Sequence, residues 1–126
     1  MIPRPLILFA HGARDPEWAR PVQAVAAKLR VENPDQPVLV AFLEFMSPTL
    51  PEAVSELIAS APEPVPALDI LPFFIAQGGH LRQEVPLMLE EIQRRHPGTS
   101  LRLLPPLGEL PSVQAAMAQA ITSLLK

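Results

Sequence analysis

Two histidines combine a reactive side chain with the same local context. His11 directly follows an apolar run and precedes a glycine, while His80 follows a second apolar run and the pair Gly78-Gly79. Buried strands that end in polar, glycine-containing loops are where α/β proteins place their ligands, so the repeated arrangement predicts one paired site. The third histidine, His96, stands in the sequence Arg-Arg-His-Pro-Gly, which is typical of a solvated helix end.

Glu44 supplies a carboxylate in a comparable position, directly after a third apolar run. Two neutral imidazoles and a carboxylate suit a divalent iron, cobalt, nickel or zinc ion, and they also suit proton abstraction near neutral pH. The sequence contains no cysteine, so any metal must be held by nitrogen and oxygen atoms. A glutamate at a strand end can instead cap the following turn through a backbone N–H, and both interpretations of Glu44 stay open.

Glycines accompany both histidines. Gly12, Gly78 and Gly79 let the backbone approach a large, flat ligand closely and adopt φ values that other residues resist. The predicted site is therefore shaped to admit a ligand larger than a metal ion.

Two arginines stand close in sequence to the two histidines. Arg14 and Arg82 are predicted to pair with ligand carboxylates, because a guanidinium group binds a carboxylate through two parallel hydrogen bonds. The alternative is an exposed ion pair with a nearby acid. The acids that could serve are Asp15 and Glu17 for Arg14, and Glu84 or the neighbours of Glu90 for Arg82.

Strands and helices alternate along the chain. Apolar runs predict strands at residues 6–10, 38–43, 68–75 and 101–104. Helical periodicity follows each run, starting near Asp15, Thr49, Leu81 and Pro111. This alternation implies parallel crossovers, and hence a three-layer α/β/α domain over residues 1–126 with a four-stranded parallel sheet. All strand-to-helix loops of such a sheet emerge at its carboxyl edge, which brings His11, Glu44 and His80 together there. With the expected strand order of 2-1-3-4, His11 and His80 would flank the crevice between the first and third strands.

Two prolines and one apolar stripe qualify this prediction. Pro21 conflicts with an uninterrupted first helix, so its first turn is expected to be separate or kinked. Pro72 removes a ladder donor and indicates an edge, a bulge or an early strand end. The last helix repeats apolar residues on one face, which predicts core or subunit interface. These residues are Val113, Met117, Ile121 and Leu124.

Composition limits the classes of protein. The 126 residues are 48% hydrophobic and 18% charged, and the net charge of −3 argues against a broad nucleic-acid surface. No apolar run approaches the roughly 20 residues that span a bilayer, and the amino terminus lacks a signal-peptide pattern. We expect a cytoplasmic protein that acts neither on membranes nor on nucleic acids.

Four motifs together resemble the small CbiX-type sirohydrochlorin chelatases, a class II chelatase family. In chain order the motifs are residues 11–16 (HGARDP), 40–44 (VAFLE), 71–80 (LPFFIAQGGH) and 105–108 (PPLG). The resemblance covers nearly the whole chain, in order and with suitable spacing. Departures from the family pattern are Ala13, where serine is common, and Gln77, where a small apolar residue is common.

The resemblance implies insertion of cobalt or ferrous iron into sirohydrochlorin, on the way to cobalamin or siroheme. His11 and His80 match the histidines that the family uses for metal binding and proton removal, and Glu44 matches an acidic residue after the second strand. The metal is then a substrate, with no tightly bound cofactor. The resemblance also implies a homodimer, in which each chain is one half of a two-lobed chelatase.

Two other functions use some of the same residues. A non-catalytic metal or tetrapyrrole carrier would differ from an enzyme only by its lack of turnover. A histidine phosphatase also places His-Gly after its first strand, but it needs an arginine before the histidine, where this chain has Ala10.

Overall fold

The computed structural model describes residues 3–126, and its centre is a four-stranded parallel sheet. The strands are β1 (Leu6–Ala10), β2 (Val38–Phe42), β3 (Ala67–Pro72) and β4 (Ser100–Leu103). The helices are η1 (Pro16–Ala19), α1 (Arg20–Glu32), α2 (Leu50–Ser60), α3 (Gly79–Arg95), η2 (Leu107–Glu109) and α4 (Pro111–Leu124). The sheet order β2-β1-β3-β4 confirms the predicted 2-1-3-4 order.

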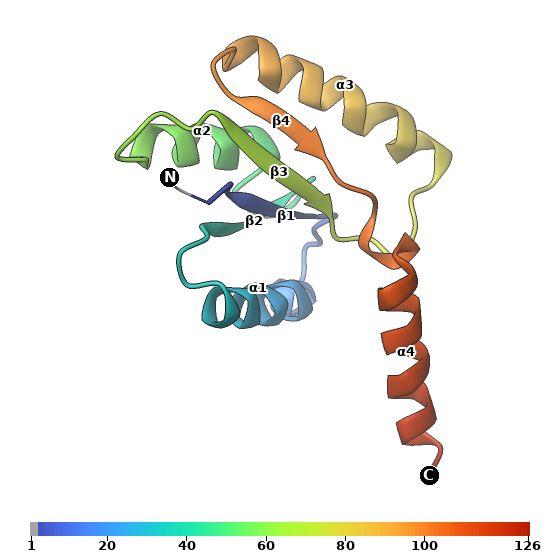
Figure 1. The fold of residues 1–126 in the computed structure, drawn as a ribbon. Helices are drawn as coiled ribbons and strands as arrows, with labels where there is room; N and C mark the ends of the chain where they lie inside the picture. The colour runs from blue at the N-terminus through green and yellow to red at the C-terminus, as the bar shows by residue number, and fades with distance from the viewer. Residues whose placement is uncertain (1–2) are drawn as a thin grey trace.

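Helices cover both faces of this sheet (Figure 1). On one face, α2 and α3 pack against alternate residues of β1 and β3, with Phe9, Leu50 and Ile70 fully buried there. On the other face, α1 packs through Val22 and Ala26 against β1 and β2. The central strand is therefore apolar on both sides, as parallel strands are when helices cover both faces.

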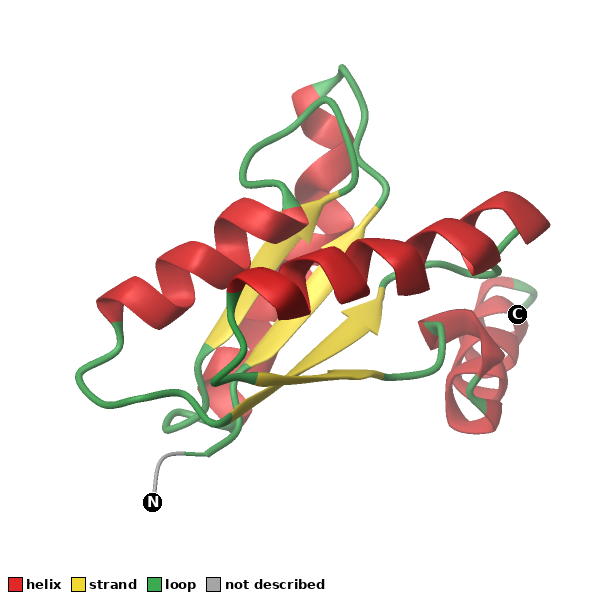
Figure 2. Cartoon of the chain, turned by 90° about the horizontal axis from the view of Figure 1, so that it is seen from above, coloured by secondary structure: helices red, strands yellow, loops and turns green. Residues whose placement is uncertain are grey.

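The fourth helix departs from the compact layers. α4 extends away from the sheet beyond η2 (Figures 1 and 2), and none of its residues is buried. Val113 and Met117 are half-buried, whereas Ile121 and Leu124 are 58% and 82% exposed. The core interpretation of this apolar stripe is therefore wrong within this chain, and the subunit-interface interpretation stays a prediction. No helix within residues 3–126 is long and apolar enough to cross a membrane.

Local sequence explains most helix starts. The Asp15 side chain accepts a hydrogen bond from the Glu17 N–H, and Pro16 opens a separate 3-10 turn before α1. Pro21 lies in the first turn of α1, so the expected separate turn is confirmed. Helical periodicity predicts that Trp18, Val22, Val25 and Leu29 share one apolar face. Trp18 in η1 is 42% exposed and Val25 in α1 is 37% exposed, so these two residues are not part of the core.

The start of α2 has the capping box that its sequence predicts. The Thr49 N–H donates to the Glu52 carboxylate at 2.8 Å, and the Thr49 hydroxyl accepts from the Glu52 N–H at 3.4 Å. The hydrogen bond from the Thr49 backbone, followed by the contact with its hydroxyl, lowers the pKa of Glu52 from its ordinary value. This hydrogen-bonded turn fixes the start of α2, shortly after Glu44 of the predicted site.

The connection between β3 and α3 differs from its prediction in two places. The strand ends at Pro72 rather than at residue 75, which is the early end that a missing ladder donor can cause. The helix begins at Gly79 rather than near Leu81, so His80 lies in its first turn and not in a loop. Gly78 occupies the N-cap position without a side-chain cap, which left the helix start without its usual sequence signal.

The β1–β2 ladder continues beyond the ends of both strands. The Leu43 N–H donates to the Ala10 carbonyl at 2.9 Å, and the Glu44 N–H donates to the His11 carbonyl at 3.1 Å. Gly12 follows with φ +93°, and a Cβ built there would lie 2.0 Å from the Glu44 carbonyl oxygen. Glycine is thus required at this position, both for its backbone conformation and for the close approach of two chain segments.

We expect Gly12→Ala to lower the free energy of unfolding by about 2 kcal/mol or more, because it adds backbone strain and a collision with the Glu44 carbonyl. Gly79→Ala is the matched control, since its Cβ would meet nothing within 4 Å and would favour the helix. Denaturant unfolding of both variants measures the difference. Equal stabilities would contradict the close approach at Gly12.

Candidate functional site

The first part of the candidate site is a contact between His11 and Glu44. The His11 Nε2 atom lies 3.1 Å from the Glu44 Oε1 atom, and the two side chains are 46% and 49% exposed. The residues are 33 positions apart, and the extended β1–β2 ladder brings them together. The Glu44 side chain therefore contacts an imidazole, which supports the site interpretation over a simple turn cap.

The second part of the candidate site is a contact between His80 and Glu84. His80 Nε2 lies 3.2 Å from Glu84 Oε1, one helical turn along α3. The sequence offers Glu84 as an ion-pair partner for Arg82. The i,i+4 spacing of His80 and Glu84 was the signal that could have found this contact, because such residues are neighbours on a helix surface.

Glu44 is linked to both histidines in different ways. It contacts His11, and it lines a cavity of about 550 Å³ together with His80 and Glu84. His11 lines a different surface cavity, of about 570 Å³. Glu44 therefore contacts one imidazole and shares a cavity with the other.

The geometry does not assemble a closed metal site. Within residues 3–126, no three histidine, aspartate or glutamate side chains are grouped so that they could hold one metal ion. The His80 side chain is 84% exposed and is free to change rotamer. The predicted ligand set of His11, His80 and Glu44 therefore stays a prediction, and the residues present an open, water-accessible group of imidazoles and carboxylates.

The two arginines have different surroundings. The Arg14 guanidinium carbon lies 5.1 Å from the ring centroid of Phe45, in a cation–π contact, while Glu17 pairs with Arg20. Arg82 Nη2 donates to the Gln77 carbonyl at 3.1 Å and so braces the loop before α3. These contacts differ from the acidic partners considered for both arginines, and ligand binding by either residue stays a prediction.

The glycines beside His80 have ordinary backbone conformations. Gly78 is extended, with φ −70° and ψ 164°, and a Cβ at Gly78 or Gly79 would meet no atom within 4 Å. The expectation that this pair needs φ values reserved for glycine is therefore corrected. Both residues are exposed at the start of α3 and leave open space beside His80.

Apolar and aromatic residues form one wall near His11. Trp18 and Phe73 line the cavity that contains His11, together with Ile75, whose side chain is 77% exposed. Behind this wall, the Gly108 N–H donates to the Phe74 carbonyl at 2.9 Å, and a Cβ at Gly108 would lie 1.9 Å from the Ile75 carbonyl oxygen. The loop over residues 105–108 thus supports the wall, as its proline content predicts.

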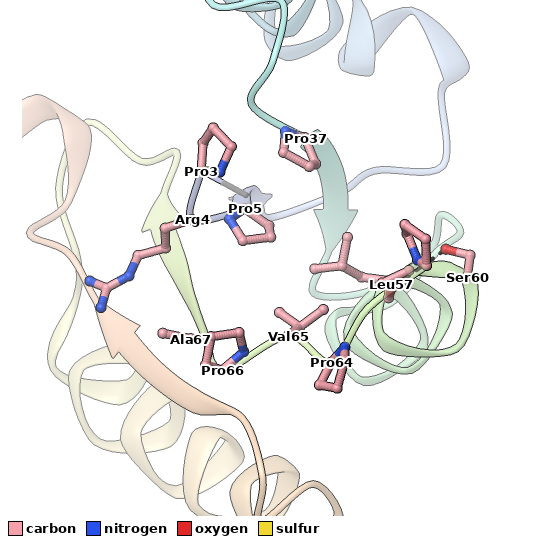
Figure 3. Close-up of a pocket in the computed structure, with 12 residues that line it drawn as sticks. Pro3, Arg4, Pro5, Pro37, Leu57, Ser60, Pro64, Val65, Pro66 and Ala67 are labelled. Carbon is pink, nitrogen blue, oxygen red and sulfur yellow. Dashed lines mark hydrogen bonds between the residues drawn. The ribbon is translucent and has the colours of Figure 1, made fainter. Parts of the chain in front are cut away.

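A separate cavity of about 650 Å³ lies at the opposite edge of the sheet (Figure 3). Prolines that precede the strands dominate its lining, and Arg4 is its only charged residue. Figure 3 shows the Arg4 guanidinium directed away from the cavity, and it contacts Asp69 at 3.3 Å. Among the described residues that line this cavity, none is a histidine, aspartate or glutamate.

Comparison with known proteins places this geometry in context. A sirohydrochlorin cobaltochelatase from Methanococcus aeolicus is 33% identical over 88 residues, which are 70% of this chain and 59% of that protein. The match therefore spans less than two thirds of that relative. A cobalamin (vitamin B12) biosynthesis CbiX protein from Marinobacter aquaeolei VT8 has a TM-score of 0.83 and 28% identity, with 98% of both chains covered.

A longer protein shares the fold. The sirohydrochlorin chelatase SirB from Bacillus subtilis, solved in complex with cobalt, has a TM-score of 0.76 and 16% identity. The similarity covers 95% of this chain and 50% of SirB. The CbiX family model matches residues 5–124, nearly the whole chain, and the chain belongs to the CbiX family.

Proposed function

We propose that this protein inserts a divalent metal, Co2+ or Fe2+, into sirohydrochlorin or a closely related tetrapyrrole. The observation that carries the proposal is that Glu44, which contacts His11, lines one cavity with His80 and Glu84 at the carboxyl edge of the sheet. The relative named sirohydrochlorin cobaltochelatase supports the substrate, and the cobalt complex of SirB supports the metal. The product would serve cobalamin or siroheme formation, and the metal is a substrate rather than a resident cofactor.

Proton balance explains why two pairs are useful. A divalent ion replaces two pyrrole N–H protons, so two protons must leave the macrocycle for each metal that enters. We assign metal binding and proton uptake to His11 and His80, with Glu44 assisting between them. Because both carboxylates contact Nε2, a neutral ring that donates Nε2–H to its carboxylate presents the Nδ1 lone pair to metal or proton.

Other residues at the same edge would hold the macrocycle. The exposed Gly78 and Gly79 leave room beside His80, and the Arg14 and Arg82 guanidinium groups are proposed to meet its carboxylates. A cytoplasmic location and a one-domain organisation over residues 1–126, both expected from the sequence, belong to the same proposal.

The first test follows metal insertion by visible absorption under anaerobic conditions, with sirohydrochlorin and either Co2+ or Fe2+. We expect many turnovers per chain, and a loss of about 100-fold or more in kcat for His11→Ala and His80→Ala, because each variant removes a proton acceptor. His96→Ala is the matched control. His96 contacts Ser55 and lies 16 residues from His80, roughly 24 Å along the α3 axis.

Each outcome of this test decides between functions. Stoichiometric pigment binding without turnover would replace the enzyme with a carrier. Undiminished insertion by His80→Ala would mean that the site is wrongly assigned. Release of phosphate from a phosphomonoester, abolished in His11→Ala, would favour the phosphatase.

Glu84 is proposed as a positioning residue for His80. Glu84→Leu removes the carboxylate that lies 3.2 Å from His80 Nε2, so we expect kcat to fall about three- to tenfold with little change in KM for the pigment. Glu84→Gln should retain most activity, because its amide oxygen can lie at the same place and accept from Nε2–H. Nitrogen-15 chemical shifts of His80 should report mainly the Nε2–H tautomer in the wild type and a mixture in Glu84→Leu.

Glu90→Gln, an exposed change farther along α3, is the control for helix charge. A Glu84→Leu variant with the tautomer and kcat of the wild type would remove Glu84 from the mechanism.

We also propose that the protein works as a homodimer with its site in a cleft between copies. The SirB similarity supports a two-copy arrangement, because this chain corresponds to half of that longer chain. The exposed apolar stripe of α4 supports it as well, since Ile121 and Leu124 are 58% and 82% exposed.

A double variant, Ile121→Asp with Leu124→Asp, should be monomeric by light scattering at micromolar concentration. Its circular dichroism should be native-like, because neither side chain is buried in the chain, and its activity should fall. Ser123→Asp on the same helix is the control. A wild-type monomer with full activity would exclude the dimer.

A further inference from the structure

Phe45 combines two features that the fold itself does not favour. Its φ is +67°, and no other non-glycine residue within residues 3–126 has a positive φ. A bulky side chain in this left-handed conformation brings Cβ close to the following carbonyl, which is why such positions usually carry glycine or asparagine. The side chain is also 57% exposed, so little burial offsets this strain.

The position of Phe45 connects it to the candidate site. Phe45 directly follows Glu44, whose carboxylate contacts His11, and the Arg14 guanidinium lies over the Phe45 ring. The Glu44 N–H···His11 carbonyl bond and the close approach at Gly12 hold the two segments side by side. An aromatic ring and a cation therefore stand together beside the His11–Glu44 pair.

The Arg14 guanidinium carbon lies 5.1 Å from the centroid of the Phe45 ring, and the Arg14 side chain is exposed. A guanidinium group in such a contact can still donate its planar fork of N–H groups to a carboxylate. The exposed part of the ring offers an apolar surface next to that cation. A ligand that contacts both the Phe45 ring and the Arg14 guanidinium is flat and apolar on its faces and carries carboxylates at its rim.

We propose that Phe45 and Arg14 form a binding subsite for such a macrocycle, with the Phe45 ring against the macrocycle and Arg14 on a peripheral carboxylate. The inference rests on the proposed function and assigns a role to Phe45, a residue outside the predicted catalytic and metal-binding set. Its strained conformation is retained because the ring acts on the ligand rather than on the fold.

The variant Phe45→Gly separates a role of the ring in ligand binding from a role in folding. If the ring acts on the ligand, the variant should weaken pigment binding without lowering the free energy of unfolding. Glycine adopts the left-handed conformation without strain, so the unfolding midpoint should stay equal or rise. Loss of the ring should raise the Kd for metal-free sirohydrochlorin about tenfold, measured by quenching of pigment fluorescence. In metal insertion, KM should rise by a similar factor with kcat little changed.

Arg14→Lys is the second variant, since it keeps the charge but loses the planar fork, and it should also weaken pigment binding. Arg94→Lys is its control, because Arg94 lies in the last turn of α3, at the opposite end of that helix from His80. This control variant should bind the pigment as the wild type does. Failure of the wild type to bind or metallate the pigment would contradict the proposed function itself. Wild-type activity with unchanged Kd in Phe45→Gly would overturn only this subsite.

Two further outcomes would also overturn the proposed Phe45–Arg14 subsite. A large fall in the unfolding midpoint of Phe45→Gly would assign the ring to the fold. Weaker dimer association with unchanged pigment binding would assign it to contact between copies.

Discussion

The continuation of the β1–β2 ladder past both strand ends is the constraint on which the site depends. Main-chain hydrogen bonds carry the strand register into the loops, and the Glu44 N–H to His11 carbonyl bond is the last of them. Gly12 then allows the first loop to pass against the Glu44 carbonyl. Because the register comes from the sheet, two exposed side chains 33 residues apart meet without support from a surrounding core.

The two imidazole–carboxylate pairs are built in different ways, and this affects how firmly each is held. His11 and Glu44 extend from neighbouring strands, so their separation follows from sheet geometry. His80 and Glu84 share one turn of a helix, and both side chains lie largely in water. An exposed helical pair of this kind contributes little to stability, which leaves His80 free to turn when a ligand arrives.

The residues that stabilise the fold and the residues of the candidate site lie in different parts of the sheet. The buried apolar strands and the helices packed on them supply the stability of the core. Prolines dominate the cavity at the amino edge, whereas His11, Glu44, His80 and Glu84 lie at the carboxyl edge. The strain at Phe45 lies at this second edge, where binding rather than packing can account for it.

Continuous apolar runs, alternating with helical periodicity, were enough to predict four parallel strands, and parallel topology then placed His11, Glu44 and His80 at one edge. Local patterns could not decide whether the apolar stripe of α4 covers its own sheet or another surface, because both interfaces need the same periodicity. The helix start at Gly78 lay outside sequence signals because it has no side-chain cap, whereas Pro72 left an edge, a bulge and an early strand end open. The sequence by itself therefore determined the elements, the edge and the family resemblance. Only the tertiary structure decided that Glu44 meets His11 and where α4 lies, because those contacts depend on register and packing between distant segments.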